Sequence, residues 1–125
     1  MRTPLLALAA IATMVAGCAS TANTTTPSAA MVIEIATFTL NPGVTPEQFR
    51  PLDRAVEEEH VAQQPGFVSR EAGVSEDGQW VAIVHWRSAE DAEASMASFA
   101  SAPATAAFMG HLQADTMVMT RYQKQ

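Results

Sequence analysis

The segment Gln79–Trp86, QWVAIVHW, constrains the fold of this chain more than any other segment, because it is apolar on both faces of a strand. Alternate residues of a β-strand point to opposite faces. One face carries both tryptophans of the chain and the other ends in a histidine: the first set is Trp80, Ala82, Val84 and Trp86, and the second is Val81, Ile83 and His85. Soluble monomers rarely leave an apolar face of this size in water, so we expect each face of this strand to be covered by another layer of the structure.

The order of the other segments predicts what covers one of these faces. Strand patterns occupy residues 31–40, 66–75, 80–86 and 115–123, and helical patterns follow the first and third of them. This order, β-α-β-β-α-β, predicts an α+β, ferredoxin-like sandwich in which a four-stranded antiparallel sheet carries two helices on one face. The face without helices can pack on a second copy, and we therefore expect a homodimer that closes into an α/β-barrel.

Local signals mark where the helices begin and where they are interrupted. Thr45 and Gln48 have the residue types and spacing of a capping box at the start of the first helix. Pro51 lies inside this helix, where it is expected to remove one hydrogen bond and bend the first turns. Pro103 interrupts the second helix, and residues 104–113 predict another short helical piece.

The N-terminal segment, residues 1–17, has the pattern of a targeting sequence. Arg2 precedes a continuous apolar run that is short for a membrane span and typical of the apolar core of a signal peptide. The run ends in VAGC, and Cys18 is the only cysteine of the chain. This ending resembles the lipobox of bacterial lipoproteins, in which the cysteine becomes the lipidated first residue. The alternatives are a buried free thiol and an ordinary signal peptide that is cleaved nearby.

The lipobox resemblance implies a location and a division of the chain. Residues 1–17 would be removed, lipidated Cys18 would anchor the chain to a membrane, and residues 18–30 would form a flexible tether to a domain at 31–125. The location implied is the bacterial cell envelope. Ala19 after the cysteine implies the outer membrane, with the domain facing the periplasm.

Two local patterns in the folded part resemble those of a known family. Pro65-Gly66-Phe67 opens the second strand, and WRSAEDA, residues 86–92, joins the third strand to the second helix. With these patterns the chain from Met31 to about Tyr122 resembles the antibiotic biosynthesis monooxygenase (ABM) family of the dimeric α/β-barrel superfamily. The resemblance implies a homodimer with a ligand cavity between the sheet and the helices of each subunit.

The chemistry implied by this resemblance is less specific than the fold, because one fold hosts several activities. The superfamily includes oxygenases that oxidise polycyclic phenols without metal or flavin, haem-degrading enzymes, and proteins with no assigned activity. We expect the chain to bind, and to oxygenate without a cofactor, a small aromatic or quinone-like compound. The alternative is a non-catalytic dimeric lipoprotein that binds a small ligand or has a structural role.

His85 and Glu34 are the candidate catalytic pair. If His85 faces inward, Glu34 on the neighbouring first strand is a natural partner, and a histidine–carboxylate pair could take the proton from a phenol. The alternative is a histidine at a strand end that is half in solvent and hydrogen-bonded once. Because His85 points away from Trp86, the two side chains cannot line one cavity through the middle of the sheet.

The expected ligand-binding residues are Trp86, Arg70, Tyr122 and His60. Trp86 could form a wall for a flat ring or fill the core, and His60 could face the cavity or be a satisfied histidine at a helix C-terminus. Arg70 and Arg121 could hold an anionic group of the ligand. They could equally pair with acidic residues predicted on the sheet, namely Glu34, Glu71 and Asp115, whereas Glu57-Glu58-Glu59 is typical of the solvated flank of a helix.

Composition excludes some partners. The formal charge is −6, and the seven basic residues are scattered, which argues against a nucleic-acid surface. The histidines at 60, 85 and 111 do not have the spacing of a metal site. The surroundings of His111 do not reproduce the ligand motif of a haem-degrading relative, so we expect neither a metal nor haem, and no other cofactor.

Overall fold

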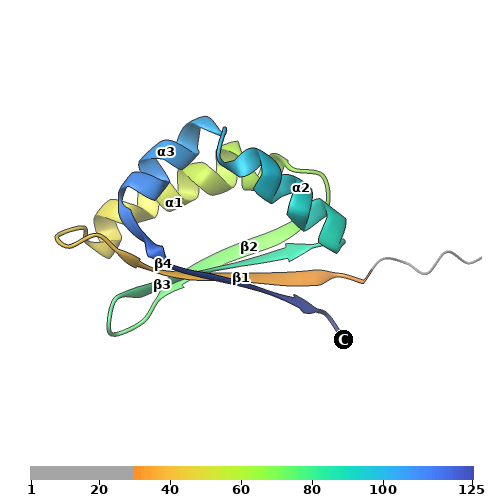
Figure 1. The fold of residues 1–125 in the computed structure, drawn as a ribbon, viewed down its shortest axis with the longest axis horizontal. Coiled ribbons are helices and arrows are strands. Elements are labelled where there is room, and N and C mark those ends of the chain that lie inside the picture. The colour runs from red at the N-terminus through yellow and green to blue at the C-terminus, as the bar shows by residue number, and fades with distance from the viewer. Residues whose placement is uncertain (1–29) are drawn as a thin grey trace, which may run out of the picture.

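Four strands form one antiparallel sheet in the order β2-β3-β1-β4 in the computed structural model, which describes residues 30–125. Three α-helices and a short 3₁₀ helix lie together over one face of this sheet (Figure 1). In chain order the elements are β1 (Val32–Leu40), α1 (Pro46–Glu59), η1 (Val61–Gln63), β2 (Phe67–Val74), β3 (Gln79–Trp86), α2 (Ala89–Phe99), α3 (Pro103–Gly110) and β4 (Leu112–Gln123). The expected signal peptide and Cys18 lie outside the described residues, as does nearly all of the expected tether.

The predicted ferredoxin-like α+β fold is confirmed, with small differences at its C-terminal end. Pro103 begins a helix of its own, so the expected interruption of the second helix separates α2 from α3. The sheet resumes at Leu112, earlier than the predicted residue 115, because the chain turns at His111 directly after α3. The helix layer therefore has three α-helices instead of two.

Local sequence signals account for the start of α1. The side chain of Thr45 accepts a hydrogen bond from the backbone N–H of Gln48, and the Gln48 side chain accepts one from the backbone N–H of Thr45. This capping box satisfies two of the N–H groups that have no partner within the helix. The helix then continues through Pro51 to Glu59.

The core lies between the sheet and the helices and is built largely from aromatic rings. Phe49 of α1 is fully buried and meets Trp80 of β3 edge to face, with 5.0 Å between the ring centroids. Phe38 of β1 packs in the same way on Phe49 and on Phe108 of α3. Such aromatic contacts add to the stabilisation that comes from burial, so this cluster fixes helices α1 and α3 on the sheet.

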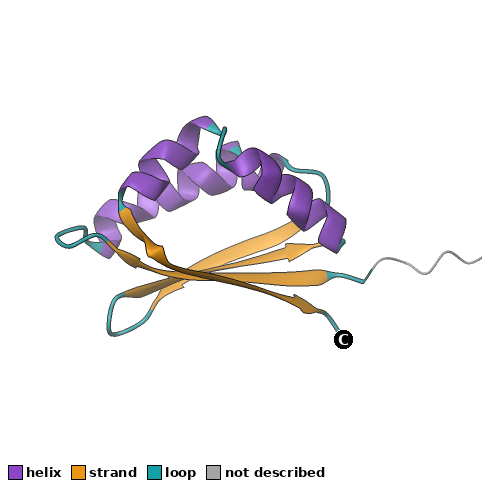
Figure 2. Ribbon diagram, viewed as in Figure 1, coloured by secondary structure: helices purple, strands orange, loops and turns teal. Residues whose placement is uncertain are grey.

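No helix from residues 30–125 lies on the second face of the sheet, as Figure 2 shows. The register of the strands places on this face the side chains of Ile33, Ile35, Val81, Ile83, His85, Val118 and Tyr122, which we call the open face. Val118 is 60% exposed and Tyr122 is 53% exposed. Both faces of β3 are thus apolar, and residues 30–125 cover only one of them. None of the helices within residues 30–125 has the length and hydropathy needed to cross a membrane.

Candidate functional site

A cavity of about 260 Å³ lies between the helix layer and the covered face of the sheet. This volume is close to the lower end of the range for ligand pockets, about 300–1,000 Å³. Both layers contribute: its walls are formed by residues of all four strands and of α1, η1, α2 and α3. A small ring compound is therefore the ligand size that the cavity suits.

The lining is mostly apolar and includes four methionines. Met96 comes from α2, Met109 from α3, and Met117 and Met119 from β4. Rings of Phe38, Phe99, Phe108 and Trp86 line it as well. Methionine is flexible and polarizable and makes favourable contacts with aromatic rings, so this lining suits a flat ring and can adapt to its shape.

Trp86 lines the cavity, at the end of β3 and opposite Val32 of β1 and Phe67 of β2. The side chain is almost fully buried, at 1% exposure. Its indole N–H is also buried, and it has no hydrogen-bond partner within residues 30–125. A buried donor without a partner is uncommon and calls for an explanation, such as a partner supplied by a bound molecule.

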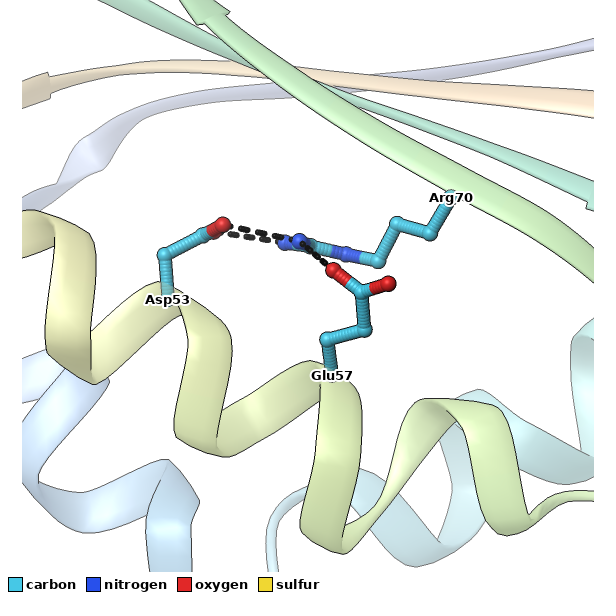
Figure 3. A network of polar contacts seen from close by, with 3 residues as sticks. All are labelled: Asp53, Glu57 and Arg70. Atoms are coloured by element: carbon cyan, nitrogen blue, oxygen red, sulfur yellow. Dashed lines mark hydrogen bonds and ion pairs between the residues drawn. The ribbon is translucent and has the colours of Figure 1, made fainter.

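Arg70 reaches from β2 into the space between sheet and helix, where two carboxylates of α1 hold it (Figure 3). Its guanidinium donates two parallel hydrogen bonds to Asp53, at 2.6 and 2.8 Å, and a third to Glu57 at 3.3 Å. The Arg70 and Asp53 side chains are 3% and 7% exposed. A planar guanidinium and a carboxylate make this two-bond geometry well, which explains why an arginine occupies the position.

These partners differ from the expected ones. Arg70 was expected to pair on the sheet or to hold an anionic ligand, but its partners lie on the helix across the layer boundary. Glu57 was expected to lie on a solvated helix flank, but its carboxylate contacts Arg70. The reason is that Asp53 and Glu57 are one helical turn apart, so both carboxylates face the sheet together.

The ionisation of Arg70 reflects this environment. Burial is the largest single influence and disfavours the charged form, but hydrogen bonds and charges from Asp53, and then from Glu57, outweigh it and raise the pKa of the Arg70 guanidinium. Arg70 therefore stays charged, and its charge is already matched by carboxylates inside the protein.

Glu34 of β1 also lines the cavity and is buried. Its Oε2 accepts a hydrogen bond at 2.7 Å from Arg121 of β4, which lies opposite it in the sheet. Arg121 is partly exposed and also approaches Glu93 of α2 at 3.8 Å. Of the residues between 30 and 125 that line this cavity, only Glu34 and Arg70 have ionisable side chains.

The expected pair of His85 with Glu34 is not formed. In the sheet His85 lies opposite Ile33, whereas Glu34 lies opposite Val84, so the two side chains are on opposite faces. His85 belongs to the open face, where its Nδ1 is 3.1 Å from the hydroxyl of Ser69. Pairing of His85 with Glu34 would require a strand register shifted by one residue, and such a shift would place the two side chains on the same face.

Tyr122 and His60 also lie away from the cavity lining. Tyr122 is opposite Ile33 and therefore belongs to the open face. His60 is buried at the end of α1, where its Nε2 is 3.2 Å from the backbone oxygen of Ser95 in α2. His60 thus joins two helices, and of the four expected ligand-binding residues only Trp86 and Arg70 line the cavity.

Metal ligands do not gather in the part of the chain that the structure describes. Within residues 30–125 no group of three histidine, cysteine, aspartate or glutamate side chains is arranged so that it could hold a metal ion.

A four-stranded antiparallel sheet, helices on one face, and a ring-sized apolar cavity between the two layers define a small α+β domain of the ferredoxin-like kind. The family model described as antibiotic biosynthesis monooxygenase matches residues 31–118, and the chain therefore belongs to this family. The matched residues span all the elements that build the cavity, up to the middle of β4. A search of curated protein sequences gave no match.

Solved structures show the same fold. SnoaB from Streptomyces nogalater, a cofactor-independent oxygenase, is 19% identical with a TM-score of 0.64, and the match covers 78% of this chain and 95% of SnoaB. A candidate antibiotic biosynthesis monooxygenase from Caulobacter crescentus CB15 is 17% identical with a TM-score of 0.63, and covers 78% of this chain and 92% of its own. Rv0793 from Mycobacterium tuberculosis is 19% identical with a TM-score of 0.56, over 77% of this chain and 96% of its own.

Proposed function

We propose that the protein binds a small aromatic or quinone-like compound in the cavity between sheet and helices. The observation that carries the proposal is the indole N–H of Trp86, which is buried, has no hydrogen-bond partner among the residues that the structure describes, and belongs to a side chain that lines the cavity. A carbonyl or hydroxyl oxygen on the ligand ring would supply the missing acceptor. The aromatic and methionine side chains of the lining would cover the faces of the ring.

The binding experiment replaces each tryptophan in turn by phenylalanine. Trp86→Phe keeps an aromatic ring but removes the N–H, and we expect it to weaken the binding of 1,4-naphthoquinone about fivefold, which corresponds to one ordinary hydrogen bond. Trp80→Phe is the matched control, because the Trp80 N–H is also buried and unpartnered within the described residues but the side chain does not line the cavity. Isothermal titration calorimetry reports both affinities. Equal affinity in the two variants would contradict the role of Trp86.

We infer further that the bound compound is oxygenated without a cofactor. The similarity to the fold of SnoaB supports this step, together with the presence of one carboxylate, Glu34, in the cavity lining. A phenol would donate its proton to Glu34, and the resulting electron-rich ring would react with O₂. Insertion of one oxygen atom at a ring C–H and loss of the other as water converts a phenol plus O₂ into a quinone plus water. The electrons come from the substrate, so no separate reductant is needed.

Oxygen uptake with 1-naphthol as the probe tests this step. We expect Glu34→Gln to bind the probe but to lose turnover, because the amide cannot accept the proton. Glu93→Gln is the control, since Glu93 also approaches Arg121 but is largely exposed and does not line the cavity. If the unaltered chain binds the probe without consuming oxygen, the protein is a carrier, which is the alternative that the mostly apolar lining favours.

We also propose that two copies associate through the open face of the sheet. The argument is the row of apolar side chains on this face, which includes Val118 at 60% exposure. An aspartate at position 118 would place a charge in the interface, and sedimentation analysis should show Val118→Asp as a monomer where the unaltered chain is a dimer. Ala97→Asp, on the exposed side of α2, should remain a dimer.

The envelope location and the lipid anchor are proposals that rest on the VAGC motif alone. Two or more acyl chains on Cys18 would hold the chain stably at a membrane. Labelled palmitate should be incorporated into the unaltered chain expressed in a Gram-negative host, and the label should be lost in Cys18→Ser. Labelling of the serine variant would assign the acylation to another position.

A further inference from the structure

Arg70 and Glu34 line the cavity, and the charges in the ion pairs that they form do not balance. Arg70 contacts Asp53 and Glu57, and Arg121 contacts Glu34. Two guanidinium groups thus face three carboxylates, which leaves an excess of one negative charge. Glu93, at 3.8 Å from Arg121 on the exposed side, adds to this excess.

Both arginines already have carboxylate partners. The guanidinium of Arg70 directs both of its terminal nitrogens at carboxylates of α1, and its side chain is 3% exposed. Arg121 directs its Nε at Glu34 and its Nη1 toward Glu93. An incoming carboxylate would compete with these partners, which would remain close by and repel it.

Burial governs how far these charges act. Charges at the protein surface are screened by water and salt, whereas the interaction of buried charges falls off much less. Asp53 and Glu34 are buried, but each is paired with a guanidinium, so the excess charge is that of Glu57, whose side chain is 34% exposed. A net negative charge therefore lies beside the cavity, and solvent screens it only in part.

We propose that the cavity selects by charge: it accepts uncharged and cationic rings and rejects rings that carry a carboxylate or another anionic group. Asp53 and Glu57 are the residues that set this selectivity, because they neutralise the one arginine that lines the cavity. The proposal rests on the proposed ligand-binding function and adds the chemical class of the ligand. It opposes one of the two alternatives given for Arg70 and Arg121, namely that they hold an anionic group of the ligand.

Three probes with the same ring system test the proposal on the full chain at neutral pH: 2-naphthol, which is uncharged, 2-naphthylmethylammonium and 2-naphthoate. Calorimetric titration gives each dissociation constant. We expect the ammonium probe to bind at least tenfold more tightly than the naphthoate, since a single buried charge pair readily produces such a difference. Equal affinity for the two ions, or tighter binding of naphthoate, would overturn the charge selection while leaving ligand binding intact. Failure of all three probes to bind would overturn the proposed function, and the selectivity with it.

Variants assign the selectivity to residues. Glu57→Gln removes one carboxylate that is only partly buried, so the fold should tolerate it. We expect its affinity for naphthoate to rise by about threefold or more and its affinity for the ammonium probe to fall by a similar factor, while 2-naphthol changes little. Asp53→Asn should act in the same direction and more strongly.

Glu59→Gln is the matched control, because it makes the same change of net charge on the same helix at an exposed position outside the cavity lining. The control should leave all three affinities unchanged. If Glu59→Gln shifts the two ions as much as Glu57→Gln does, the selectivity comes from the net charge of the protein, and the assignment to the cavity is wrong.

Discussion

The pair of Asp53 and Arg70 leads to a quantitative prediction about stability. In the variant Asp53→Ala, the guanidinium of Arg70 stays between sheet and helix but loses both of its short hydrogen bonds. Removing one partner of a buried ion pair costs about 3–5 kcal/mol of folding free energy, because the other charge is left without compensation.

The structure places this case near the lower end of that range. Glu57 would remain as a partner of Arg70 at 3.3 Å and would compensate part of its charge, although solvent limits this compensation because the Glu57 side chain is 34% exposed. We therefore expect Asp53→Ala to lower the free energy of unfolding by about 3 kcal/mol. Glu58→Ala, at an exposed position of the same helix, should change it by no more than about 0.5 kcal/mol.

A double-mutant cycle tests the physical reason. Arg70→Met removes the charge and keeps much of the side-chain volume. In this background the change Asp53→Ala should cost little folding free energy, because no buried charge is left without a partner. The coupling energy between the two changes should therefore be about 2 kcal/mol or more. Urea unfolding followed by tryptophan fluorescence gives the free energies, and an unchanged slope shows that the unfolded state is comparable. A loss below about 1 kcal/mol in Asp53→Ala, or additive losses in the double variant, would refute the reasoning.

Two further predictions concern turns. Gly66 and Gly43 have positive φ angles of +83° and +84°, but an added Cβ would overlap the Asp91 carboxyl group only at Gly66 and would meet nothing close by at Gly43. Both alanine variants should lose about 1–2 kcal/mol of folding free energy because of the backbone conformation. Gly66→Ala should in addition show a clearly lower Tm than Gly43→Ala, because of the overlap. Equal Tm values would contradict the overlap. In the hairpin, the Ser75 hydroxyl donates a hydrogen bond to Asp77, and this bond, ahead of the local backbone contacts, lowers the pKa of Asp77 from its ordinary value of 3.8. A carboxyl with a lowered pKa in the folded state stabilises the fold above its unfolded pKa, and this contribution is lost as the pH falls through the folded value. Ser75→Ala should therefore raise the pKa of Asp77 in an NMR titration, and an unchanged pKa would rule out the hydroxyl as the cause.

Much of the fold could be predicted because its signals are local. The residue types of Thr45 and Gln48 define the capping box, and alternation along β3 places Trp86 on the same face as Trp80 without knowledge of any neighbour. The break at Pro103 was visible in the sequence as well, although its outcome, a third helix, depends on how α3 packs on the aromatic core. Local chemistry thus specified the elements, and packing decided how the last of them divide.

The site was less predictable because it depends on which residues lie opposite one another. Whether Glu34 faces His85 or Val84 is a matter of strand register, and a shift of one residue moves a side chain to the other face. Asp53 was missed, although its position carried a signal. It lies between Phe49 and Val56 on the apolar stripe of α1, where a charged residue indicates a buried partner across the interface.

The position of Glu34 bears on whether a net negative cavity can support oxygenation, which passes through an anion. Transfer of a proton from a bound phenol to Glu34 creates a phenolate and removes a carboxylate, so the total charge in the cavity stays the same. Arg121, which loses its ionised partner in that step, then faces a phenolate in place of the carboxylate. Binding of a phenolate from solution would instead add a negative charge beside carboxylates that already outnumber the two arginines. The substrate should therefore enter uncharged and ionise only after it is bound.

This order predicts how turnover depends on pH. For a series of naphthols of different acidity, kcat/KM should fall as the pH rises above the pKa of each free naphthol, because the uncharged form that the cavity accepts becomes scarce. The pH of the fall should move with the acidity of the substrate, which distinguishes this cause from the titration of a group on the protein. Oxygen uptake measured with two naphthols of well-separated pKa is sufficient. A rate that rises through the pKa of the substrate would mean that the anion is the form that binds, and charge selection by Asp53 and Glu57 could not then be correct.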